Sequence, residues 1–409
     1  MKVFSPDELS VIRVAGRGGE GTVYEVTTPA GERLAYKRYH PDVLSQRGVD
    51  LERKLRAMLT NPPHVPSGGM DHAALLWPIA IVMLESNFYG FCMPLLSDTN
   101  LKLVSIVDAR GRQRSAREDW TWAARLVICH NLCIALSALH SVGAAYGDLN
   151  EENAVVNRDG LVTLLDLDSI SLQTTDGTYY PGSGATRDDW RPPEYSESSV
   201  FTQDGDSWAL AVQIYMLLME STRPYSASGV GYPPVEAVRR GTFPVLDPSL
   251  LPPRSSPPLD LLPPSLRALF KRTFGAGKDR PELRPRASEY ATAITAILGT
   301  LRSCPDVPSH VWAPPRTVCP WCERNRSAHD QPPHQNQIRI PQVFSGGQLA
   351  ESSARSAPPQ STESTAQQPL KRKSRTGRVI AGVGCAFLII AILLVIVVMA
   401  GTLMLLSSF

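Results

Sequence analysis

The polar loop within residues 136–168 constrains this chain more than any other stretch. It follows apolar residues at helical spacing, and it presents Asp148 and then Asn153 at the head of a short apolar run. A second apolar run, residues 162–165, delivers Asp166 at its end. Two strands after a helix would therefore carry Asp148, Asn153 and Asp166 to one edge. Their oxygens suit Mg²⁺, and one free carboxylate could orient a phosphoryl acceptor.

A glycine-rich turn precedes this loop. Residues 11–26 read as strand, turn and strand, and the turn has the pattern G-x-G-x-x-G-x-V, formed by Gly16, Gly18, Gly21 and Val23. Glycines let backbone N–H groups approach phosphate because no Cβ intervenes. The alternative, a dinucleotide-binding turn, requires a helix after the last glycine, whereas residues 22–26 alternate like a strand. We therefore expect a hairpin that covers a nucleotide.

The next expected strand, residues 33–39, contains a lysine that is a candidate for binding the α and β phosphates of a nucleotide. Lys37 follows Ala35 by two residues, as in the V-A-I-K motif. An expected helix over residues 49–59 includes Glu52, which we predict to pair with Lys37; an exposed, solvated Glu52 is the alternative.

The loop with Asp148 resembles the catalytic and metal loops of the protein-kinase superfamily. Residues 146–148 read Tyr-Gly-Asp where kinases have His-Arg-Asp, and Asn150 replaces the lysine that usually follows. Residues 166–168 read Asp-Leu-Asp where the metal motif is Asp-Phe-Gly. The resemblance implies that Asp148 orients the acceptor hydroxyl and that Asn153 and Asp166 hold Mg²⁺. It also suggests Asp168 as a second metal carboxylate.

Further matches occur in chain order. The strand at residues 87–95 resembles the one that leads into the adenine-binding hinge, with Met93 as gatekeeper and Leu95 at the nucleotide. Asp206 resembles the aspartate that braces the catalytic loop, and Glu194 is expected to pair with Arg284. The fold class implied is α+β, a bilobal protein-kinase-like fold with an N-lobe at 1–96 and a C-lobe at 97–300.

A cysteine and histidine cluster follows the lobes. The spacing of Cys304, His310, Cys319 and Cys322 is C-x5-H-x8-C-x2-C. A closed Cys₃His shell predicts structural Zn²⁺ in a small zinc-ribbon-like element at 301–325. An accidental cysteine pair and a redox-active dithiol are the alternatives.

The C-terminal part of the chain has the composition of a tether and an anchor. Residues 326–378 are rich in Ser, Gln and Pro and predict a disordered linker that ends in a basic run at 371–378. Residues 379–406 are apolar for longer than the roughly 20 residues that cross a bilayer. The N-terminus lacks the apolar core of a signal peptide. We therefore expect a single-pass cell-membrane protein whose kinase domain is cytoplasmic.

Charge argues against a nucleic-acid partner. The formal net charge is +2, and five basic residues lie in the run at 371–378, so the rest of the chain is slightly acidic.

The departures from typical kinases match a bacterial kinase-like group. Members have Gly-Asp in the catalytic loop, Asp-x-Asp-Ser in the metal motif and a C-terminal Cys-Pro-Trp-Cys element, as residues 319–322 read here. This resemblance implies bacterial signalling, with a PPM-type phosphatase and a von Willebrand A-type protein as partners.

The sequence thus predicts a membrane-tethered, ATP-dependent Ser/Thr protein kinase with ATP, Mg²⁺ and structural Zn²⁺. A pseudokinase that acts as a nucleotide-binding scaffold or regulator is the alternative, because the loop Arg and Lys are missing. A small-molecule kinase, suggested by Gly147-Asp148, is a third reading.

Overall fold

The computed structural model describes residues 1–65, 72–107, 120–183, 186–196 and 200–329. These residues belong to one compact unit, Met1–His334. The predicted membrane helix at 379–406, the basic run at 371–378 and the predicted linker beyond residue 329 lie outside the described residues.

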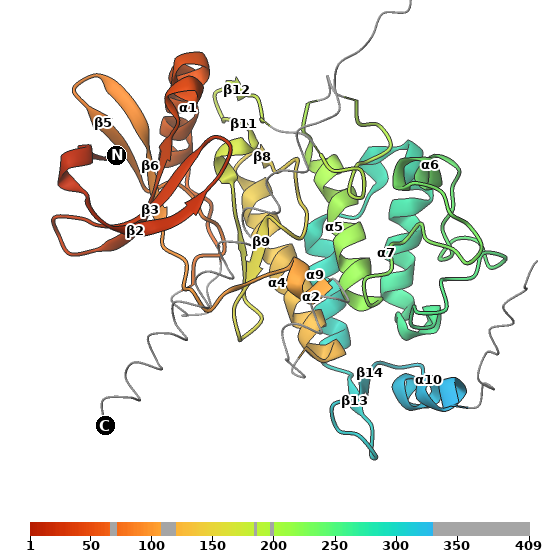
Figure 1. Ribbon diagram of the computed structural model, residues 1–409. Coiled ribbons are helices and arrows are strands. Elements are labelled where there is room, and N and C mark those ends of the chain that lie inside the picture. Colours follow the sequence, from red (N-terminus) through yellow and green to blue (C-terminus); the bar gives the residue numbers. More distant parts are fainter. Residues whose placement is uncertain (66–71, 108–119, 184–185, 197–199, 330–409) are drawn as a thin grey trace, which may run out of the picture. The chain divides into compact units, whose positions relative to one another are not determined.

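A six-stranded sheet forms the first part of the fold, here called the sheet lobe (Figure 1). Its order is β1-β5-β6-β4-β3-β2; β1 runs parallel to β5, and the other neighbours are antiparallel. The strands are β1 (Lys2–Phe4), β2 (Ser10–Arg17), β3 (Gly21–Thr27), β4 (Arg33–Tyr39), β5 (Ala80–Leu84) and β6 (Asn87–Pro94). The predicted strand–turn–strand at the glycines is therefore the β2–β3 hairpin, which pairs Arg17 with Thr22.

Helix α1 (Pro41–Thr60) packs against β5 and β6. Proline suits the first helical position because the N–H it lacks would have no partner there. Val43, Leu51, Leu55 and Met58 form the buried face, and the Trp77 indole N–H donates to the Met58 carbonyl (3.0 Å). The helix is longer than the predicted segment 49–59, and the additional turns place its N-terminal half beside the glycine turn.

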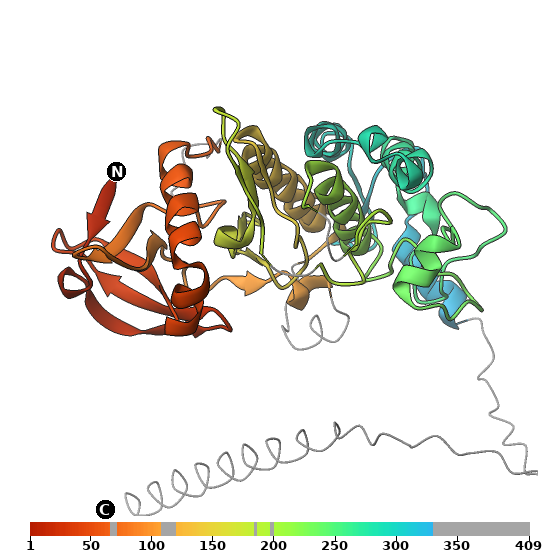
Figure 2. The ribbon, with the colours of Figure 1, turned by 90° about the horizontal axis from the view of Figure 1, so that it is seen from above.

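The second part, here called the helical lobe, is built on α4, which contacts α5 and α9, while α7 contacts both of those helices. Figures 1 and 2 show these four helices side by side. The helices of this lobe are α2 (Val104–Val107), α4 (Trp122–Ser141), α5 (Gln203–Leu218), α6 (Pro234–Arg239), α7 (Pro264–Phe274), α8 (Ala276–Asp279) and α9 (Ala287–Leu298). Short 3-10 turns lie at Pro6–Glu8, Leu167–Ser169, Leu259–Leu261 and Pro281–Leu283.

Helix α4 is apolar on nearly every side. Thr121 caps its start by accepting the Ala124 N–H (3.2 Å). By length and composition, α4 is the one helix within the described residues that could cross a membrane, but most of it is buried in this lobe. A helix that is hydrophobic all round is typical of a protein core as well as of a membrane span. We therefore interpret α4 as the core helix that supports the loop after it.

Aromatic packing and one ion pair with a buried arginine stabilise the end of the lobe. Trp208 meets Phe274 edge-on with 5.2 Å between ring centroids, and Phe243 stacks on Phe274. Arg284 is 3% exposed and makes two hydrogen bonds to Glu194, of 2.7 and 2.6 Å. The guanidinium also lies over the Trp208 ring. The predicted pairing of Glu194 with Arg284 is confirmed.

Short strands occupy the region between the two lobes. They form two three-stranded sheets, ordered β10-β9-β7 and β12-β11-β8. The strands are β7 (Leu101–Lys102), β8 (Ala144–Ala145), β9 (Ala154–Val156), β10 (Val162–Leu164), β11 (Ser171–Gln173) and β12 (Tyr179–Tyr180). The antiparallel pairing of β9 with β10 brings the start of one strand beside the end of the other, as Ala154 opposite Leu164 shows.

A small element follows α9. It consists of a hairpin, β13 (Arg302–Ser303) with β14 (Val311–Trp312), and helix α10 (Pro320–His329). Trp312 is buried where β14 contacts α4, and Arg324 pairs with Glu220 of the helical lobe (2.9 Å). The linker was predicted to begin at residue 326, but α10 continues to His329. Pro320 favours the start of the helix, and the pair of Arg324 with Glu220 holds its middle against the helical lobe.

Candidate active site

The loop that carries Asp148 is held from below by Asp206 of α5. This carboxylate is 1% exposed and accepts the backbone N–H groups of Tyr146 (2.6 Å) and Gly147 (2.8 Å). His140 Nε2 lies 2.9 Å from it. Because two consecutive N–H groups point at one side chain, the backbone before Asp148 has a fixed direction. The predicted bracing role of Asp206 is confirmed.

Tyr146 ties the same loop to the two short strands above it. Its hydroxyl lies 2.7 Å from the carbonyl oxygen of Leu165, at the end of β10, and 3.0 Å from that of Asn153, just before β9. Sequence reasoning noted Tyr146 only as a departure from histidine. A buried ring with a hydroxyl beside a polar loop was the available signal, since such hydroxyls need partners.

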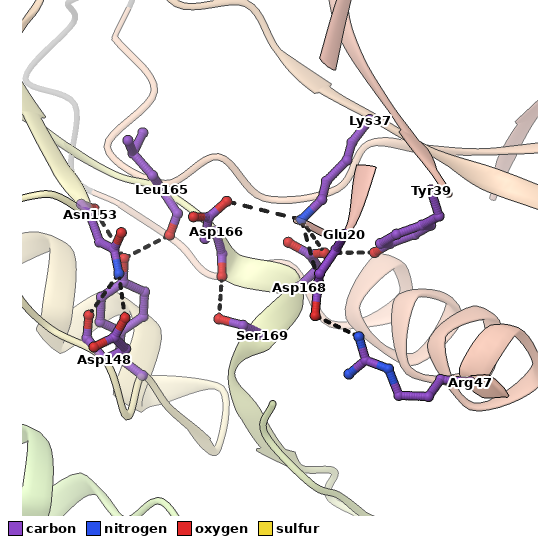
Figure 3. Close-up of polar contacts among 11 residues, drawn as sticks. Glu20, Lys37, Tyr39, Arg47, Asp148, Asn153, Leu165, Asp166, Asp168 and Ser169 are labelled. Carbon is purple, nitrogen blue, oxygen red and sulfur yellow. Dashed lines mark hydrogen bonds and ion pairs between the residues drawn. The ribbon is translucent and has the colours of Figure 1, made fainter. Parts of the chain in front are cut away.

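Asp148 and Asn153 come together as predicted (Figure 3). Asn153 Nδ2 donates to Asp148 Oδ2 (2.8 Å), and Asn150 Nδ2 donates to Oδ1 (2.9 Å). Asn150, in the place of the usual lysine, is 1% exposed and supplies hydrogen bonds but no charge. Burial raises the pKa of Asp148, although these two amides oppose the effect.

The metal motif directs its two aspartates to different places. Asp166 is left-handed (φ 48°, ψ 41°), and its side chain is 64% exposed. The following 3-10 turn buries Leu167 (1% exposed) and Asp168 (3% exposed). The sharp backbone turn at Asp166 therefore sends one carboxylate toward the cleft and the next into the protein.

Lys37 of β4 meets the buried carboxylate. Its ammonium lies 2.6 Å from Asp168 Oδ2, 4.0 Å from Asp166 Oδ1 and 3.9 Å from Glu20 Oε2 (Figure 3). The Tyr39 hydroxyl donates to the same Asp168 oxygen (2.7 Å). Burial disfavours charge on both partners. The lysine nevertheless lowers the pKa of Asp168, and the surrounding carboxylates raise that of Lys37.

The prediction that Glu52 pairs with Lys37 is wrong. Glu52 accepts from Arg56 Nε one helical turn later (2.8 Å). The side of α1 nearer the site carries cations: Arg47 pairs with Glu20 (2.5 Å), and the Lys54 ammonium donates to the Pro181 carbonyl (3.2 Å). Helical periodicity predicted the helix but not which of its faces lies toward Lys37. A difference of one or two residues in sequence changes the face, and Glu52 lies on a different one. Burial lowers the pKa of Lys54 to about 8.

A cavity of about 620 Å³ joins these groups. Apart from Glu52, every residue predicted to bind nucleotide lines this cavity: Gly16, Gly18, Gly21, Val23, Lys37, Met93 and Leu95. Asp148, Asn153 and Asp166 line it too. Asp168 and Glu52 do not line it. The lining combines apolar side chains such as Val23, Met93 and Leu95 with charged groups such as Lys37 and Asp166, and this combination suits an adenine ring and its phosphates.

The donor set fits Mg²⁺. The Asp166 carboxylate is largely exposed and lies beside the cavity. Asn153 turns its Nδ2 to Asp148, which leaves its side-chain oxygen as the atom available for a ligand. Hard carboxylate and amide oxygens are what this cation binds, usually together with phosphate oxygens. Asp168, in contrast, is committed to Lys37 and Tyr39.

Comparison with known proteins agrees with this geometry. Residues 9–231 match the model for the protein kinase domain. The chain belongs to the protein kinase domain family. It is 26% identical to protein kinase YegI of Escherichia coli over 341 residues, which are 79% of this chain and 50% of that protein.

Two further relatives carry kinase names. Serine/threonine-protein kinase PknD of Chlamydia caviae is 25% identical over 232 residues, 51% of this chain and 24% of PknD. Wall-associated receptor kinase-like 4 of Arabidopsis thaliana is 26% identical over 263 residues, 59% of this chain and 32% of that protein. The chain thus spans half or less of the length of these relatives.

Gly147 offers a stability test of the loop. Its φ is +78°, and a Cβ there would lie 2.0 Å from the Phe201 ring. We expect Gly147→Ala to lower the free energy of unfolding by about 2–4 kcal/mol, because left-handed strain and overpacking add. Chemical or thermal denaturation measures the loss.

Gly31→Ala is the matched control, since Gly31 has φ +80° but open space around it. It should lose only the conformational part, about 1 kcal/mol. In the Phe201→Ala background, Gly147→Ala should lower the free energy of unfolding by less than it does in the wild type, because the clashing ring is gone. Equal losses at Gly147 and Gly31 would contradict the steric account.

Proposed function

We propose that this protein is an ATP-dependent protein kinase that transfers the γ-phosphoryl group to Ser/Thr hydroxyls of proteins. The observation that carries the proposal is the single cavity lined by the glycine turn, Lys37, Asp148, Asn153 and Asp166. The specificity for Ser/Thr is inferred from the name of the relative PknD, a serine/threonine-protein kinase. Protein substrates are inferred from the match to the protein kinase domain.

The residues have separate roles in this proposal. The glycine turn and Lys37 bind the phosphates of ATP. Asp148 accepts a hydrogen bond from the acceptor hydroxyl and orients it, while Asn150 and Asn153 fix the carboxylate. Asn153 and Asp166 would hold Mg²⁺, which when bound neutralises charge on the phosphates. Asp166 is the aspartate available to bind the metal, because Asp168 is paired with Lys37.

A pseudokinase remains the second candidate, favoured by one observation. The buried Asn150 stands where a lysine usually steadies the transferring phosphate, and it contributes no positive charge. Against it, both Asp148 and Asp166 are present and line the cavity.

The full-length protein with radiolabelled ATP and Mg²⁺ should show phosphoryl transfer, at least to itself. Asp166→Ala should abolish transfer because a metal carboxylate is lost. Asp148→Ala should slow it about 10²–10⁴-fold while ATP binding persists, because Asp148 acts on the acceptor. Exposed Asp159 supplies the control Asp159→Ala, which should transfer at the wild-type rate. ATP binding by wild type without transfer to itself or to an acceptor panel would favour the pseudokinase.

We also propose that Cys304, His310, Cys319 and Cys322 bind one structural Zn²⁺. Their ligand atoms all lie within 4.8 Å of one another. Cys304 Sγ is 3.7 Å from Cys322 Sγ, and His310 Nδ1 is 3.6 Å from Cys319 Sγ and 3.4 Å from Cys322 Sγ. Bonds of ~2.0–2.3 Å in a tetrahedron put ligand atoms roughly 3.3–3.8 Å apart. The upstream Cys and His favour zinc over a redox dithiol, since a dithiol leaves them without a role.

Metal analysis of the full-length protein should find close to one zinc per chain. The double variant Cys319→Ser with Cys322→Ser should lose zinc and keep ATP binding, because the cluster lies outside the nucleotide cavity. Cys92→Ala, a buried thiol in β6, should keep the zinc. A metal-free wild type whose thiols cycle with a reductant would support redox chemistry instead.

Finally, we propose that residues 379–406 anchor the chain in the cell membrane with the kinase domain in the cytoplasm, in a bacterial signalling system. The apolar length supports a membrane span. The basic run at 371–378 supports the orientation. A PPM-type phosphatase and a von Willebrand A-type protein are the proposed partners, on the strength of the motif resemblance alone.

Protease added outside intact cells should spare the kinase domain, because ATP and the basic flank both lie inside. Neutralising the basic run at 371–378 should make the orientation mixed. Permeabilised cells provide the control for cleavage. Digestion of the kinase domain in intact cells would reverse the proposed topology.

A further inference from the structure

Helix α1 offers no carboxylate to Lys37. Its three acidic residues all lie elsewhere: Asp42 and Asp50 are exposed, and Glu52 binds Arg56. The α1 side chains that reach toward the site are Arg47 and Lys54, both cations. An ammonium that must be held in a buried position therefore needs its counter-ion from another element.

Asp168 meets that need. It is 3% exposed, and its Oδ2 lies 2.6 Å from the Lys37 ammonium. The Tyr39 hydroxyl donates to the same oxygen, and the Lys37 ammonium lies 5.4 Å from the centre of the Tyr39 ring. Lysine, aspartate and tyrosine thus form a closed group behind the cavity. Figure 3 shows Asp168 between Lys37 and Tyr39.

The placement of Asp168 argues against its direct contact with the metal or nucleotide. Asp166, two residues earlier, lines the cavity, whereas Asp168 does not. Asp168 belongs to the 3-10 turn Leu167–Ser169, which begins right after the left-handed residue Asp166. One short segment therefore supplies a carboxylate to each side of Lys37: an exposed one in the cavity and a buried one behind it.

We propose that Asp168 is the positioning residue for Lys37, taking the place of a carboxylate from α1. The inference rests on the proposed nucleotide site. An ammonium has three donors, so Lys37 can keep one bond to Asp168 and turn the others to phosphate. Because the partner comes from the metal segment, the position of Lys37 is set together with that of Asp166. It does not depend on where α1 lies.

The test measures ATP binding by the full-length protein at saturating Mg²⁺, in a double-mutant cycle of Lys37→Met and Asp168→Asn. Each single change should weaken ATP binding on the order of tenfold, as expected for a charge-assisted hydrogen bond. In the Lys37→Met background, Asp168→Asn should have no further effect, because Asp168 acts only through Lys37. Asp168→Glu should restore part of the affinity by keeping the carboxylate.

Glu52→Gln makes the same charge change on α1 and tests the rival partner. We expect Asp168→Asn, and not Glu52→Gln, to couple to Lys37→Met. Melting temperatures with no nucleotide report any loss of fold separately from the coupling.

Additive effects of Lys37→Met and Asp168→Asn would overturn the assignment, as would coupling to Glu52 in place of Asp168. A raised Mg²⁺ requirement of Asp168→Asn that persists with Lys37→Met would overturn it too, since it would make Asp168 a metal ligand. The readout is binding, so it is independent of turnover. Intact coupling in a protein that never transfers phosphate would overturn the proposed catalysis and keep this assignment.

Discussion

The arrangement of the site depends on one buried carboxylate, that of Asp206. It lies in the first turns of α5, where the helix dipole favours negative charge, and it receives two backbone N–H groups and His140. A buried carboxylate is costly unless every oxygen is paired, and here both are. These bonds come from the backbone of the catalytic loop. A shift of the loop would therefore leave the buried carboxylate without these hydrogen-bond partners. The direction of Asp148 follows from that constraint.

From this anchor the geometry propagates through Tyr146. Its N–H is held by Asp206, and its hydroxyl lies at the carbonyls of Asn153 and Leu165. Asn153 directly precedes β9. Leu165 directly follows β10, and Asp166 comes next. A single aromatic residue thus fixes the separation between the loop with Asp148 and the strand ends with the metal groups. Histidine has no hydroxyl with which to make this connection in the same way.

The sequence allowed much of this site to be predicted, because order and spacing along the chain encode it. Asp148, Asn153 and Asp166 follow from two short strands after a helix, and the glycine turn follows from strand alternation around it. The Lys37 partner did not follow. On a helix, a shift of one or two residues changes the face, so periodicity alone could not decide between Glu52 and its neighbours. The side that Asp168 faces depends on the left-handed backbone at Asp166, for which the sequence carried no signal.

Transferring the lysine's counter-ion to the metal segment changes what α1 can do. A helix that must supply a carboxylate to Lys37 would be held at one distance from β4. Here α1 instead contacts the glycine turn through Arg47 and Glu20, and the segment after β12 through Lys54 and the Pro181 carbonyl. Glu20 lines the cavity, as does Ser183, two residues after Pro181. Glu20 is also 3.9 Å from Lys37, so phosphate that draws Lys37 forward competes with Glu20 for it. Arg47 would keep its pair with Glu20, since that contact does not involve Lys37. The two cations of α1 therefore tie the helix to the glycine turn and to the segment near Pro181, and neither contact requires a carboxylate of α1 at Lys37.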